Sequence, residues 1–322
     1  MGALRASFVP SPLTKAVIEG SARPRGVDLA VEDNSGKTTS QIIEENSKRM
    51  VALDLDVAEM SFGTFTRARD LNVPILALPV FPGRRFLQPA IVVRADSDMQ
   101  EPKDLRGKRA AIGQFWMTAF CWHRVILNTR YGVKQTEISW VCTQPERWDR
   151  LPKPQAEVTL DTSGREPLAL LKAGEVDAAF LSNANGLRGD GQEEGVRRLF
   201  AEPAKTQLQY YKQTGVFPII HLVVMREELA QDRNLYDEVA EALRESKQLG
   251  LEEMVESPTE GPVFGGKPTE VRSVFGFDPY PYGVEANRQA LETFLNDAFT
   301  HQHLTERQVR VEDLVPAHLL AR

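Results

Sequence analysis

Cysteine is scarce in this sequence, because Cys121 and Cys142 are the only two among 322 residues. They lie far apart, and the chain has neither C-x-x-C spacing nor a dense cysteine framework. This excludes a disulfide-rich scaffold and the usual thiolate metal motifs. We therefore predict two buried, apolar thiols.

Long runs of basic or apolar residues are also absent. Lys and Arg number 39 against 45 Asp and Glu, which gives a net charge of −6, and basic residues form only pairs such as Arg84-Arg85 and Arg197-Arg198. A protein that binds a phosphate backbone carries a basic patch, so we expect no nucleic acid partner. No apolar run approaches the roughly 20 residues of a membrane-spanning helix, so we expect no membrane partner.

The first residues lack the features of a secretory signal. Residues 1–8 contain no basic start, no apolar stretch of sufficient length and no small-residue cleavage site. We therefore expect a cytoplasmic protein, although a chain from which a leader had been removed would look the same.

Several motifs of well-known enzyme classes are missing. The chain has no Walker A sequence, no GxGxxG and no GxSxG, which excludes the usual nucleotide, dinucleotide and α/β-hydrolase sites. His301-Gln302-His303 holds the only close histidine pair, and it lacks the helical acidic partner of an HExxH motif. We predict a solvated helix end there, no metal site and no cofactor.

Short apolar runs alternate with amphipathic stretches along the chain, and this alternation predicts an α/β fold. The length is about twice that of a usual single domain, which favours two domains or one two-lobed unit. The predicted strands are 4–9, 27–31, 57–60, 75–80, 90–94, 109–112, 138–141, 176–181 and 219–225. The predicted helices are 39–50, 63–71, 116–131, 166–172, 236–256 and 283–300.

Two segments are candidates for crossings between lobes. Residues 95–109 are polar and lie between two predicted strands, and Gly215 and Pro218 interrupt the chain before a β-rich run. These crossings predict that residues 1–94 and 218–322 form one lobe and residues 95–217 the other, with a ligand cleft between them.

Residues 113–119 follow a predicted strand and begin a predicted helix. The free NH groups and positive dipole of a helix start favour an anion, and Gln114 and Trp116 would offer a polar group beside a flat surface. The alternative is that Thr118 only caps the helix and the aromatic residues only pack. His123 and Arg124, further along this helix, are typical of a surface pair.

Two other segments carry candidate chemistry. Arg84 and Arg85 lie in a loop that is otherwise apolar, and a guanidinium forms two parallel hydrogen bonds with a carboxylate; two solvated charges are the alternative. His221 lies within an apolar run. An imidazole titrates near neutral pH and can transfer a proton, but a core histidine with satisfied hydrogen bonds is equally consistent with the pattern.

Five sequence segments together resemble the 4,5-dihydroxyphthalate decarboxylase family in content, order and spacing, over nearly the whole chain. They are Val57-Ala58-Glu59-Met60-Ser61; Phe81-Pro82 with Arg84 and Phe86; Met117-Thr118-Ala119 with Trp122 and Arg124; Tyr210-Tyr211 with the run Thr214 to His221; and Pro281-Tyr282-Gly283-Val284-Glu285 with Asn287-Arg288. The resemblance implies a type 2 periplasmic-binding-protein-like fold, with two α/β lobes and a cleft, in agreement with the predicted lobes.

The chain also departs from the family pattern. It has Ser11-Pro12-Leu13-Thr14, Leu87-Gln88-Pro89 and Gln114-Phe115-Trp116, where the pattern carries more charged residues. We therefore expect a less charged, more aromatic cleft and a different substrate.

The preferred hypothesis is a cofactor-independent decarboxylase of a hydroxylated aromatic carboxylic acid, active in aromatic compound catabolism. Residue type, context and the resemblance assign proton transfer to His221 and the carboxylate contact to Arg84, with Arg85 or Arg124. Polar contacts are assigned to Ser61, Gln114 and Thr118, and ring stacking to Trp116 and Phe217. The alternative is a non-catalytic solute-binding protein for a small aromatic acid. The oligomeric state stays open, and a homo-oligomer is one option.

Overall fold

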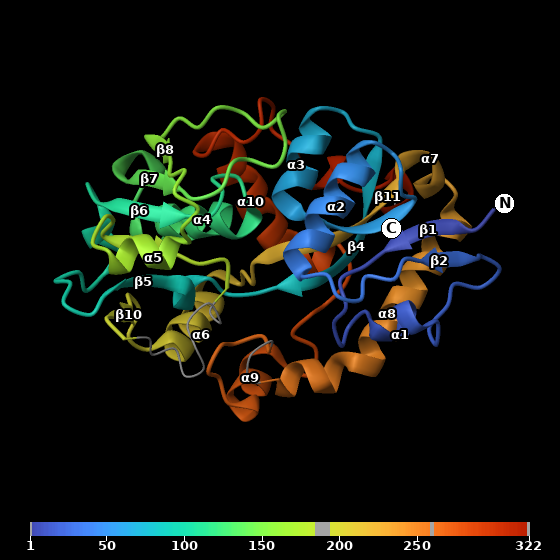
Figure 1. Cartoon of the computed structure of the whole chain (residues 1–322). Helices are drawn as coiled ribbons and strands as arrows, with labels where there is room; N and C mark the ends of the chain where they lie inside the picture. The colour runs from blue at the N-terminus through green and yellow to red at the C-terminus, as the bar shows by residue number, and fades with distance from the viewer. Residues whose placement is uncertain (1, 184–193, 258–260, 321–322) are drawn as a thin grey trace.

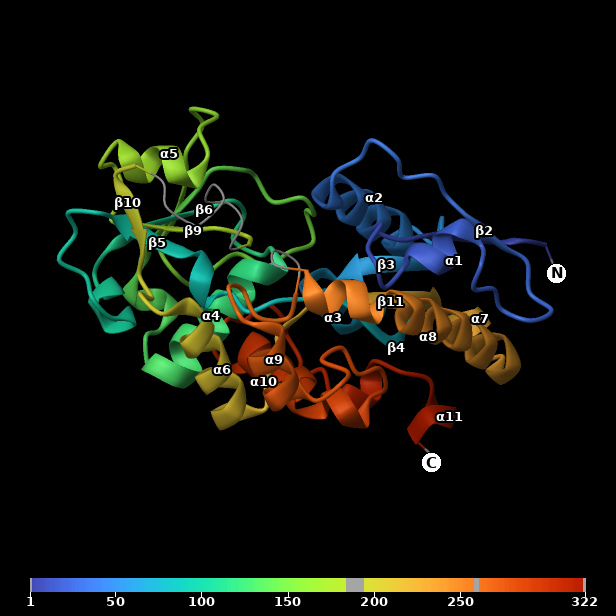
Figure 2. The ribbon, with the colours of Figure 1, turned by 90° about the horizontal axis from the view of Figure 1, so that it is seen from below.

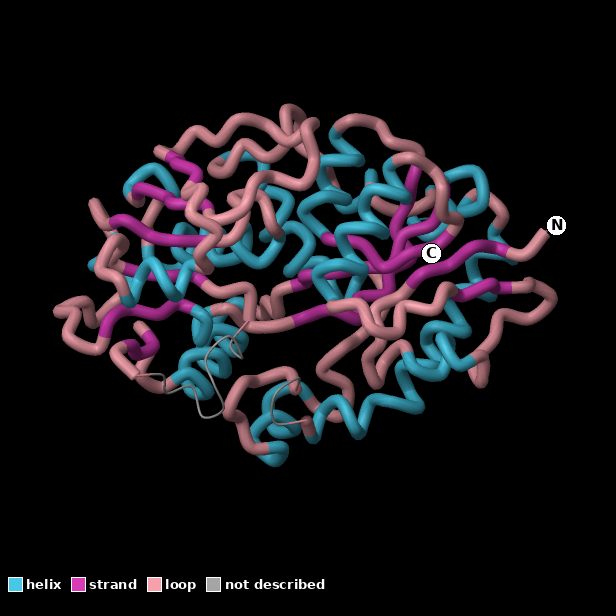
Figure 3. The backbone as a smooth tube through the Cα atoms, in the orientation of Figure 1, coloured by secondary structure: helices cyan, strands magenta, loops and turns pink. Residues whose placement is uncertain are grey.

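The computed structural model describes residues 2–183, 194–257 and 261–320. Its strands form two separate sheets, which lie on opposite sides of the molecule (Figures 1 and 3). Helices pack on both sheets, so the predicted α/β class is confirmed.

The first sheet has the order β2-β1-β3-β11-β4. β1 pairs in parallel with β2 and β3, whereas β11 runs antiparallel between β3 and β4. Its strands are β1 (Leu4–Ser7), β2 (Leu29–Val31), β3 (Val57–Ser61), β4 (Ile75–Arg84) and β11 (Ile219–Arg226).

The second sheet has the order β10-β5-β9-β6-β7-β8. Its inner strands β9, β6 and β7 are parallel, and β5 is antiparallel to both of its neighbours. Its strands are β5 (Ile91–Arg94), β6 (Arg109–Ile112), β7 (Ser139–Cys142), β8 (Val158–Leu160), β9 (Ala178–Phe180) and β10 (Val196–Arg198).

The placement of β5 corrects one boundary of the predicted lobes. The range 1–94 puts this strand with the first sheet, but it pairs with β9 and β10 of the second. Sheet membership therefore moves the first crossing to residues 85–90. The sequence could not show this, because the apolar pattern of a strand identifies its buried faces but not the sheet that it joins. The division into lobes with ends at 94 and 217 otherwise stays a prediction.

Helices link the strands and cover the sheets. The longer ones are α2 (Thr39–Val51), α3 (Phe62–Asp70), α4 (Thr118–Tyr131), α6 (Pro203–Thr214), α8 (Arg233–Glu256), α9 (Pro268–Phe275) and α10 (Arg288–Thr300). The short ones are α1 (Lys15–Glu19), α5 (Pro167–Lys172), α7 (Glu227–Ala230) and α11 (Ala317–Leu320). Seen from below, α8 runs along the first sheet (Figure 2).

The long helix α8 is fixed at its start by a cap and along its length by an apolar face. Asp232 accepts a hydrogen bond from the Leu235 NH at 3.1 Å, which satisfies an NH group that the helix itself cannot. Tyr236, Val239 and Leu243 are buried in an apolar cluster with side chains of β1, β3, β4 and β11.

Gly250 brings α8 very close to the first strand–helix loop. A Cβ atom at this position would lie 1.8 Å from the Pro12 carbonyl oxygen, so only glycine allows this approach. The contact holds the loop that includes Ser11, a residue of the cavity described below.

Candidate functional site

A cavity of about 490 Å³ lies between the two sheets, and segments adjoining each sheet contribute residues to its lining. Side chains of the first sheet and α2 face those of the segments after β6 and β7. Of the predicted site residues, Ser61, Arg84, Arg85, Gln114, Trp116, Thr118 and His221 line this cavity. Arg124 and Phe217 do not line it.

The strand register brings Glu59, Ser61 and His221 to one face of the first sheet. His221 on β11 is directly opposite Ser61 on β3, and Val223 is opposite Glu59. Residues two apart on a strand share a face, and neighbouring strands place such side chains within contact distance. The three polar side chains therefore meet where β3 ends.

On its other side, β11 meets an irregular part of β4. His221 pairs with Gly83 and Val223 with Leu78, so residues 79–82 of β4 bulge out of the ladder. Pro79 and Pro82 lie in this stretch, and proline cannot donate a ladder hydrogen bond. Bulges change the direction of nearby side chains, and this one lies beside His221.

His221 is held by Glu59. The imidazole Nδ1 is 3.0 Å from Glu59 Oε1, and both residues are buried. The other carboxylate oxygen, Oε2, accepts a hydrogen bond from the Val9 NH at 3.1 Å. Glu59 also lines the cavity. Its place in the segment 57–61 that resembles the decarboxylase family was the only sequence signal for it.

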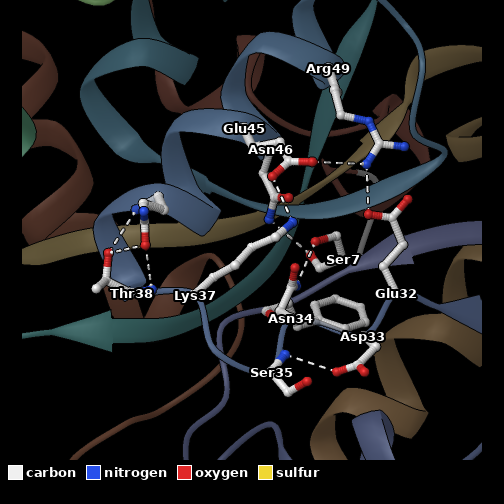
Figure 4. A network of polar contacts seen from close by, with 12 residues as sticks. Ser7, Glu32, Asp33, Asn34, Ser35, Lys37, Thr38, Glu45, Asn46 and Arg49 are labelled. Carbon is white, nitrogen blue, oxygen red and sulfur yellow. Dashed lines mark hydrogen bonds and ion pairs between the residues drawn. The ribbon is translucent and has the colours of Figure 1, made fainter.

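The backbone of Glu59 is tied to α2 and β1. Asn46, on α2, donates hydrogen bonds from Nδ2 to the Glu59 carbonyl oxygen at 2.9 Å and to the Ser7 carbonyl oxygen at 3.2 Å. Asn34 donates to Ser7 Oγ at 3.0 Å. Figure 4 shows Asn34, Ser7 and Asn46 within a larger polar network that extends along α2. These contacts fix α2 beside β3, so its exposed face can form one wall of the cavity.

Arg84 is a buried cation in the cavity wall. It is 6% exposed, and its Nη2 donates to Asn287 Oδ1. Its guanidinium carbon lies 5.4 Å from the Phe81 ring centre and 5.5 Å from the Phe217 ring centre. No carboxylate pairs with it among the described residues, and its Nε has no hydrogen-bond partner there. Desolvation lowers the pKa of Arg84 to about 10.

The half-buried Arg85 also lines the cavity. Its backbone NH donates to the Pro218 carbonyl oxygen at 3.3 Å. This bond joins the two segments through which the chain passes between the sheets, so Arg84 and Arg85 lie where the two crossings meet.

Ser61 and Thr118 connect the two sides of the cavity. Their hydroxyl oxygens are 2.6 Å apart, and the Gly63 NH donates to Thr118 Oγ1 at 2.8 Å. Met117, and not Thr118, is the N-cap residue of α4, so the alternative that Thr118 only caps this helix is wrong. Thr118 instead links the start of α4 to β3 and α3.

Gln114 and Trp116 support the loop that follows β7. Gln114 Nε2 donates to the Pro145 carbonyl oxygen at 2.7 Å, and Trp116 Nε1 donates to the Pro152 carbonyl oxygen at 2.8 Å. The Trp116 backbone NH donates to Glu146 Oε1 at 3.1 Å. Both predicted residues line the cavity, but their polar groups are already bonded to this loop.

The interpretation of His123 and Arg124 as a surface pair is wrong. Both are buried, at 1% and 2% exposure, because α4 packs between other elements on nearly all sides. The Arg124 guanidinium lies 3.9 Å from the Phe115 ring centre, and its Nε donates to Gln302 Oε1 at 3.2 Å. Desolvation lowers the pKa of Arg124 below its usual value. In this conformation Arg124 supports the aromatic residues behind the cavity and does not reach it.

Phe217 lies behind Arg84. Its ring stacks on Phe86 with 4.8 Å between ring centres and also contacts Phe275 and Tyr280. The predicted stacking on a ligand is therefore replaced here by stacking within the protein, where the ring forms one side of the Arg84 site.

The exposed end of the cavity carries a group of charges that the sequence did not reveal. Arg147 Nε is 3.1 Å from Glu44 Oε2 on α2, and Arg147 Nη2 donates to Ser40 Oγ at 3.0 Å. Lys48 Nζ is 2.7 Å from Glu44 Oε1. Glu44 thus pairs with two cations, one on each side of the cavity. We call Glu44, Lys48 and Arg147 the outer charge group.

The chain matches, over residues 39–249, the family described as ABC transporter, phosphonate, periplasmic substrate-binding protein. This match covers most of the chain. The protein belongs to this family.

Two relatives are similar in sequence, and both are named 4,5-dihydroxyphthalate decarboxylase. The protein from Comamonas testosteroni is 29% identical over 253 residues, which are 75% of this chain and 76% of the relative. The protein from Pseudomonas putida is 28% identical over 166 residues, which are 49% of this chain and 64% of the relative. The resemblance seen in the sequence segments is therefore confirmed.

Solved structures of periplasmic binding proteins share the fold. A sulfonate-binding protein from Methylobacillus flagellatus has a TM-score of 0.56 at 13% identity, with 100% of this chain and 93% of that chain covered. An alkanesulfonate-binding protein from Xanthomonas axonopodis, bound to MOPS, has a TM-score of 0.54 at 15% identity, with 98% of each chain covered. These likenesses confirm the predicted periplasmic-binding-protein-like fold.

The described residues hold neither a metal-binding cluster nor a membrane-spanning helix. Within residues 2–183, 194–257 and 261–320, no three His, Cys, Asp or Glu side chains come together as a metal site would require. In the same part of the chain, no helix has the length and apolar character needed to cross a bilayer.

Proposed function

We propose that this member of the family is a cofactor-independent decarboxylase of a hydroxylated aromatic carboxylic acid. The observation that carries the proposal is that His221, held by Glu59, and Arg84, which has no carboxylate partner among the described residues, line the same cavity. A proton donor and a carboxylate site are what this reaction needs. The two relatives named decarboxylases support the same reaction class.

Arg84 would bind the carboxylate of the ligand. A buried guanidinium forms stronger hydrogen bonds than one in water, and the neutral amide of Asn287 leaves its charge uncompensated. The ligand carboxylate would supply the missing counter-charge. Binding at this point would also fix the ring in the cavity, where Ser61 and Thr118 offer hydroxyl groups.

His221 would then protonate the ring. A hydroxyl group ortho or para to the carboxylate donates electron density, so that the carbon bearing the carboxylate can accept a proton from the imidazolium. The bond between that carbon and the carboxylate breaks, its electron pair restores the aromatic ring, and CO₂ leaves. The neutral imidazole takes up a proton from water before the next turnover.

Solute binding without turnover is the second candidate. The family match and the solved structures that share the fold, such as a sulfonate-binding protein, favour it. A type of fold alone does not decide between binding and catalysis. The predicted cytoplasmic location, the role in aromatic compound catabolism and the oligomeric state stay predictions under either function.

One experiment separates the two functions. Purified protein is incubated with a panel of hydroxybenzoates and hydroxyphthalates, and CO₂ release and thermal stability are measured on the same samples. Release of CO₂ that persists after exhaustive chelation supports the proposed decarboxylase. Stabilisation by a ligand without CO₂ release supports the solute-binding protein, and loss of activity on chelation with recovery on adding a divalent ion would contradict a cofactor-independent reaction.

A further inference from the structure

We propose that Glu59 is a positioning residue that holds neutral His221 with its proton on Nδ1, so that Nε2 is the nitrogen that exchanges a proton with a ligand. The catalytic meaning of this inference rests on the proposed function, but the proton position does not. The inference is carried by the hydrogen bonds around Glu59 and by the space around the His221 ring.

The surroundings of Glu59 decide the direction of its bond to His221. Glu59 Oε2 accepts from the Val9 NH, which can only donate, and Oε1 is 3.0 Å from His221 Nδ1. A carboxylate is an acceptor with both oxygens. Nδ1 must therefore donate, and in neutral imidazole the other nitrogen, Nε2, then carries a lone pair.

The side of the His221 ring that carries Nε2 faces the cavity. His221 lines the cavity while Nδ1 faces Glu59, and the two nitrogens lie on different sides of an imidazole ring. No described residue bonds Nε2, and this atom is not among the fully buried polar atoms without a partner. It is thus accessible to a ligand.

Gly83 gives the ring room to lie in this position. A Cβ atom at Gly83 would lie 2.7 Å from His221 Nδ1 and 2.8 Å from its Cβ and Cγ atoms, closer than real Cβ contacts allow. Gly83 is the register partner of His221 at the bulge of β4. Glu59 and Gly83 together therefore fix the ring from two sides.

His123 provides an internal reference with the opposite proton position. Its Nε2 is 3.0 Å from the Leu87 carbonyl oxygen, which can only accept, and no described residue bonds its Nδ1. Desolvation lowers the pKa of His123 to about 3, so this ring is neutral under ordinary conditions. We expect it to carry its proton on Nε2.

The test is a ¹⁵N spectrum of the full chain with labelled histidines, of which there are five, recorded in alkaline buffer where imidazoles are neutral. The His221 signals are assigned by their loss in His221→Gln. We expect a protonated Nδ1 and an unprotonated Nε2 for His221, and the reverse for His123. A His221 ring that carries its proton on Nε2 in the wild-type protein overturns the proposal. The proton position is read from the wild-type spectrum, and His221→Gln serves only to assign the signals.

An isosteric variant sharpens the test. In Glu59→Gln the amide has one acceptor, which the Val9 NH requires, so its NH₂ group turns to His221 Nδ1. The proton of His221 should then move to Nε2. Glu44→Gln, which changes another cavity glutamate that does not contact His221, should leave the His221 spectrum unchanged. An unchanged His221 spectrum in Glu59→Gln overturns the proposal.

Gly83→Ala tests the second constraint. The added methyl group should displace the His221 ring and weaken the signal of the His221 Nδ1 that is bonded to Glu59. Gly2→Ala, where a Cβ meets nothing within 4 Å, should leave this signal unchanged. These spectra require no turnover, so they remain decisive if no decarboxylation is found. If it is found, Glu59→Gln should lower kcat by about 10-fold or more with little change in KM.

Discussion

Arg84 and Asn287 are hydrogen-bonded partners although they are 203 positions apart in the sequence. Asn287 in turn donates from Nδ2 to the Pro281 and Gly283 carbonyl oxygens at 2.9 and 2.6 Å. The segment before α10 therefore orients the guanidinium without neutralising it. We propose that the charge of Arg84 is left for a ligand, and we expect its burial to lower the stability of the ligand-free protein.

Arg84→Met should show both effects. The variant should bind an aromatic carboxylate about 10- to 100-fold more weakly, since a hydrogen bond to a charged group contributes about 1.5 to 3 kcal/mol. Its ligand-free form should melt about 2 °C higher or more. Desolvation lowers the pKa of Arg84 to about 10. Below that pH the guanidinium is charged in the folded protein, and its burial costs free energy of folding. The methionine side chain removes this cost.

Calorimetry and ligand titration check this prediction. Arg233→Met, which changes an exposed arginine on α8, should alter neither quantity. Unchanged ligand affinity in Arg84→Met would remove Arg84 from the binding site.

His221→Gln should lower turnover by about 100-fold or more, because positioned general acids contribute about 10²- to 10⁴-fold. Ligand binding should persist, since Arg84 is intact. Rates of CO₂ release and ligand-induced thermal shifts, measured side by side, check both parts. Full activity in this variant would show that another group protonates the ring.

The cavity should prefer a monocarboxylate to a matched dicarboxylate. Arg84 can pair with one carboxylate, whereas in the outer charge group Lys48 and Arg147 are already paired with Glu44. A second carboxylate without its own partner is buried at a net cost. Values of kcat/KM for both substrate types decide the point.

Glu44→Gln is the matched variant for this prediction. It frees the two cations of the outer charge group and should move the preference toward the dicarboxylate. A tenfold or larger preference of the wild-type protein for the dicarboxylate, about 1.4 kcal/mol, would contradict the expected selectivity.

The two thiols should be unreactive while the protein is folded. Burial raises the pKa of Cys121 to about 11 and that of Cys142 to about 12, and both side chains are buried. The reactive thiolate is therefore nearly absent at pH 8. A thiol reagent should modify neither cysteine before denaturant is added and both afterwards; rapid modification of either one in the native protein at pH 8 would contradict this.

Gly250→Ala should destabilise the protein by about 1 to 3 kcal/mol or more. In an unconstrained helix this change would stabilise by about 1 kcal/mol, but the new Cβ would lie 1.8 Å from the Pro12 carbonyl oxygen. We therefore expect the destabilising clash to outweigh the gain in helix propensity, so that the net change in the free energy of unfolding is a loss. Leu249→Ala, at a position 67% exposed, should change stability by only about 0.5 kcal/mol. Denaturant unfolding compares the two variants, and a more stable Gly250→Ala protein would refute the close contact.

The elements with strong apolar patterns could be predicted from the sequence, and those with weak patterns could not. All nine predicted strands are present, and all except β2 bury one face or both; the residues of β2 are half-buried or exposed. The strands β8 and β10 were missed because each has only three residues and little buried surface. The helix α6 was missed because only Gln207 and Tyr210 are buried along it, so it has almost no apolar stripe.

Residue type identified part of the site, but long-range pairing decided the rest. His221 and Arg84 stood out because each is an ionisable group in an apolar segment. The contact of His221 with Glu59 joins residues 162 positions apart, and that of Arg147 with Ser40 joins residues 107 apart. No local pattern encodes such pairs. The same limit explains why Arg124 and Phe217 were assigned to the ligand when both pack inside the protein.

The bonds of Arg147 to Ser40 and Glu44 have a kinetic consequence. They connect the loop after β7 to α2 at the exposed end of the cavity, so a salt bridge joins the two walls of the cavity there. A ligand that enters between α2 and this loop would pass only when the bridge opens, and its residence time would depend on how often the bridge does so. Under the proposed decarboxylation, a product that has lost its carboxylate would no longer bind Arg84, yet by this route it would leave only when the bridge opens, so its release would be slower than the chemical step if opening is rare.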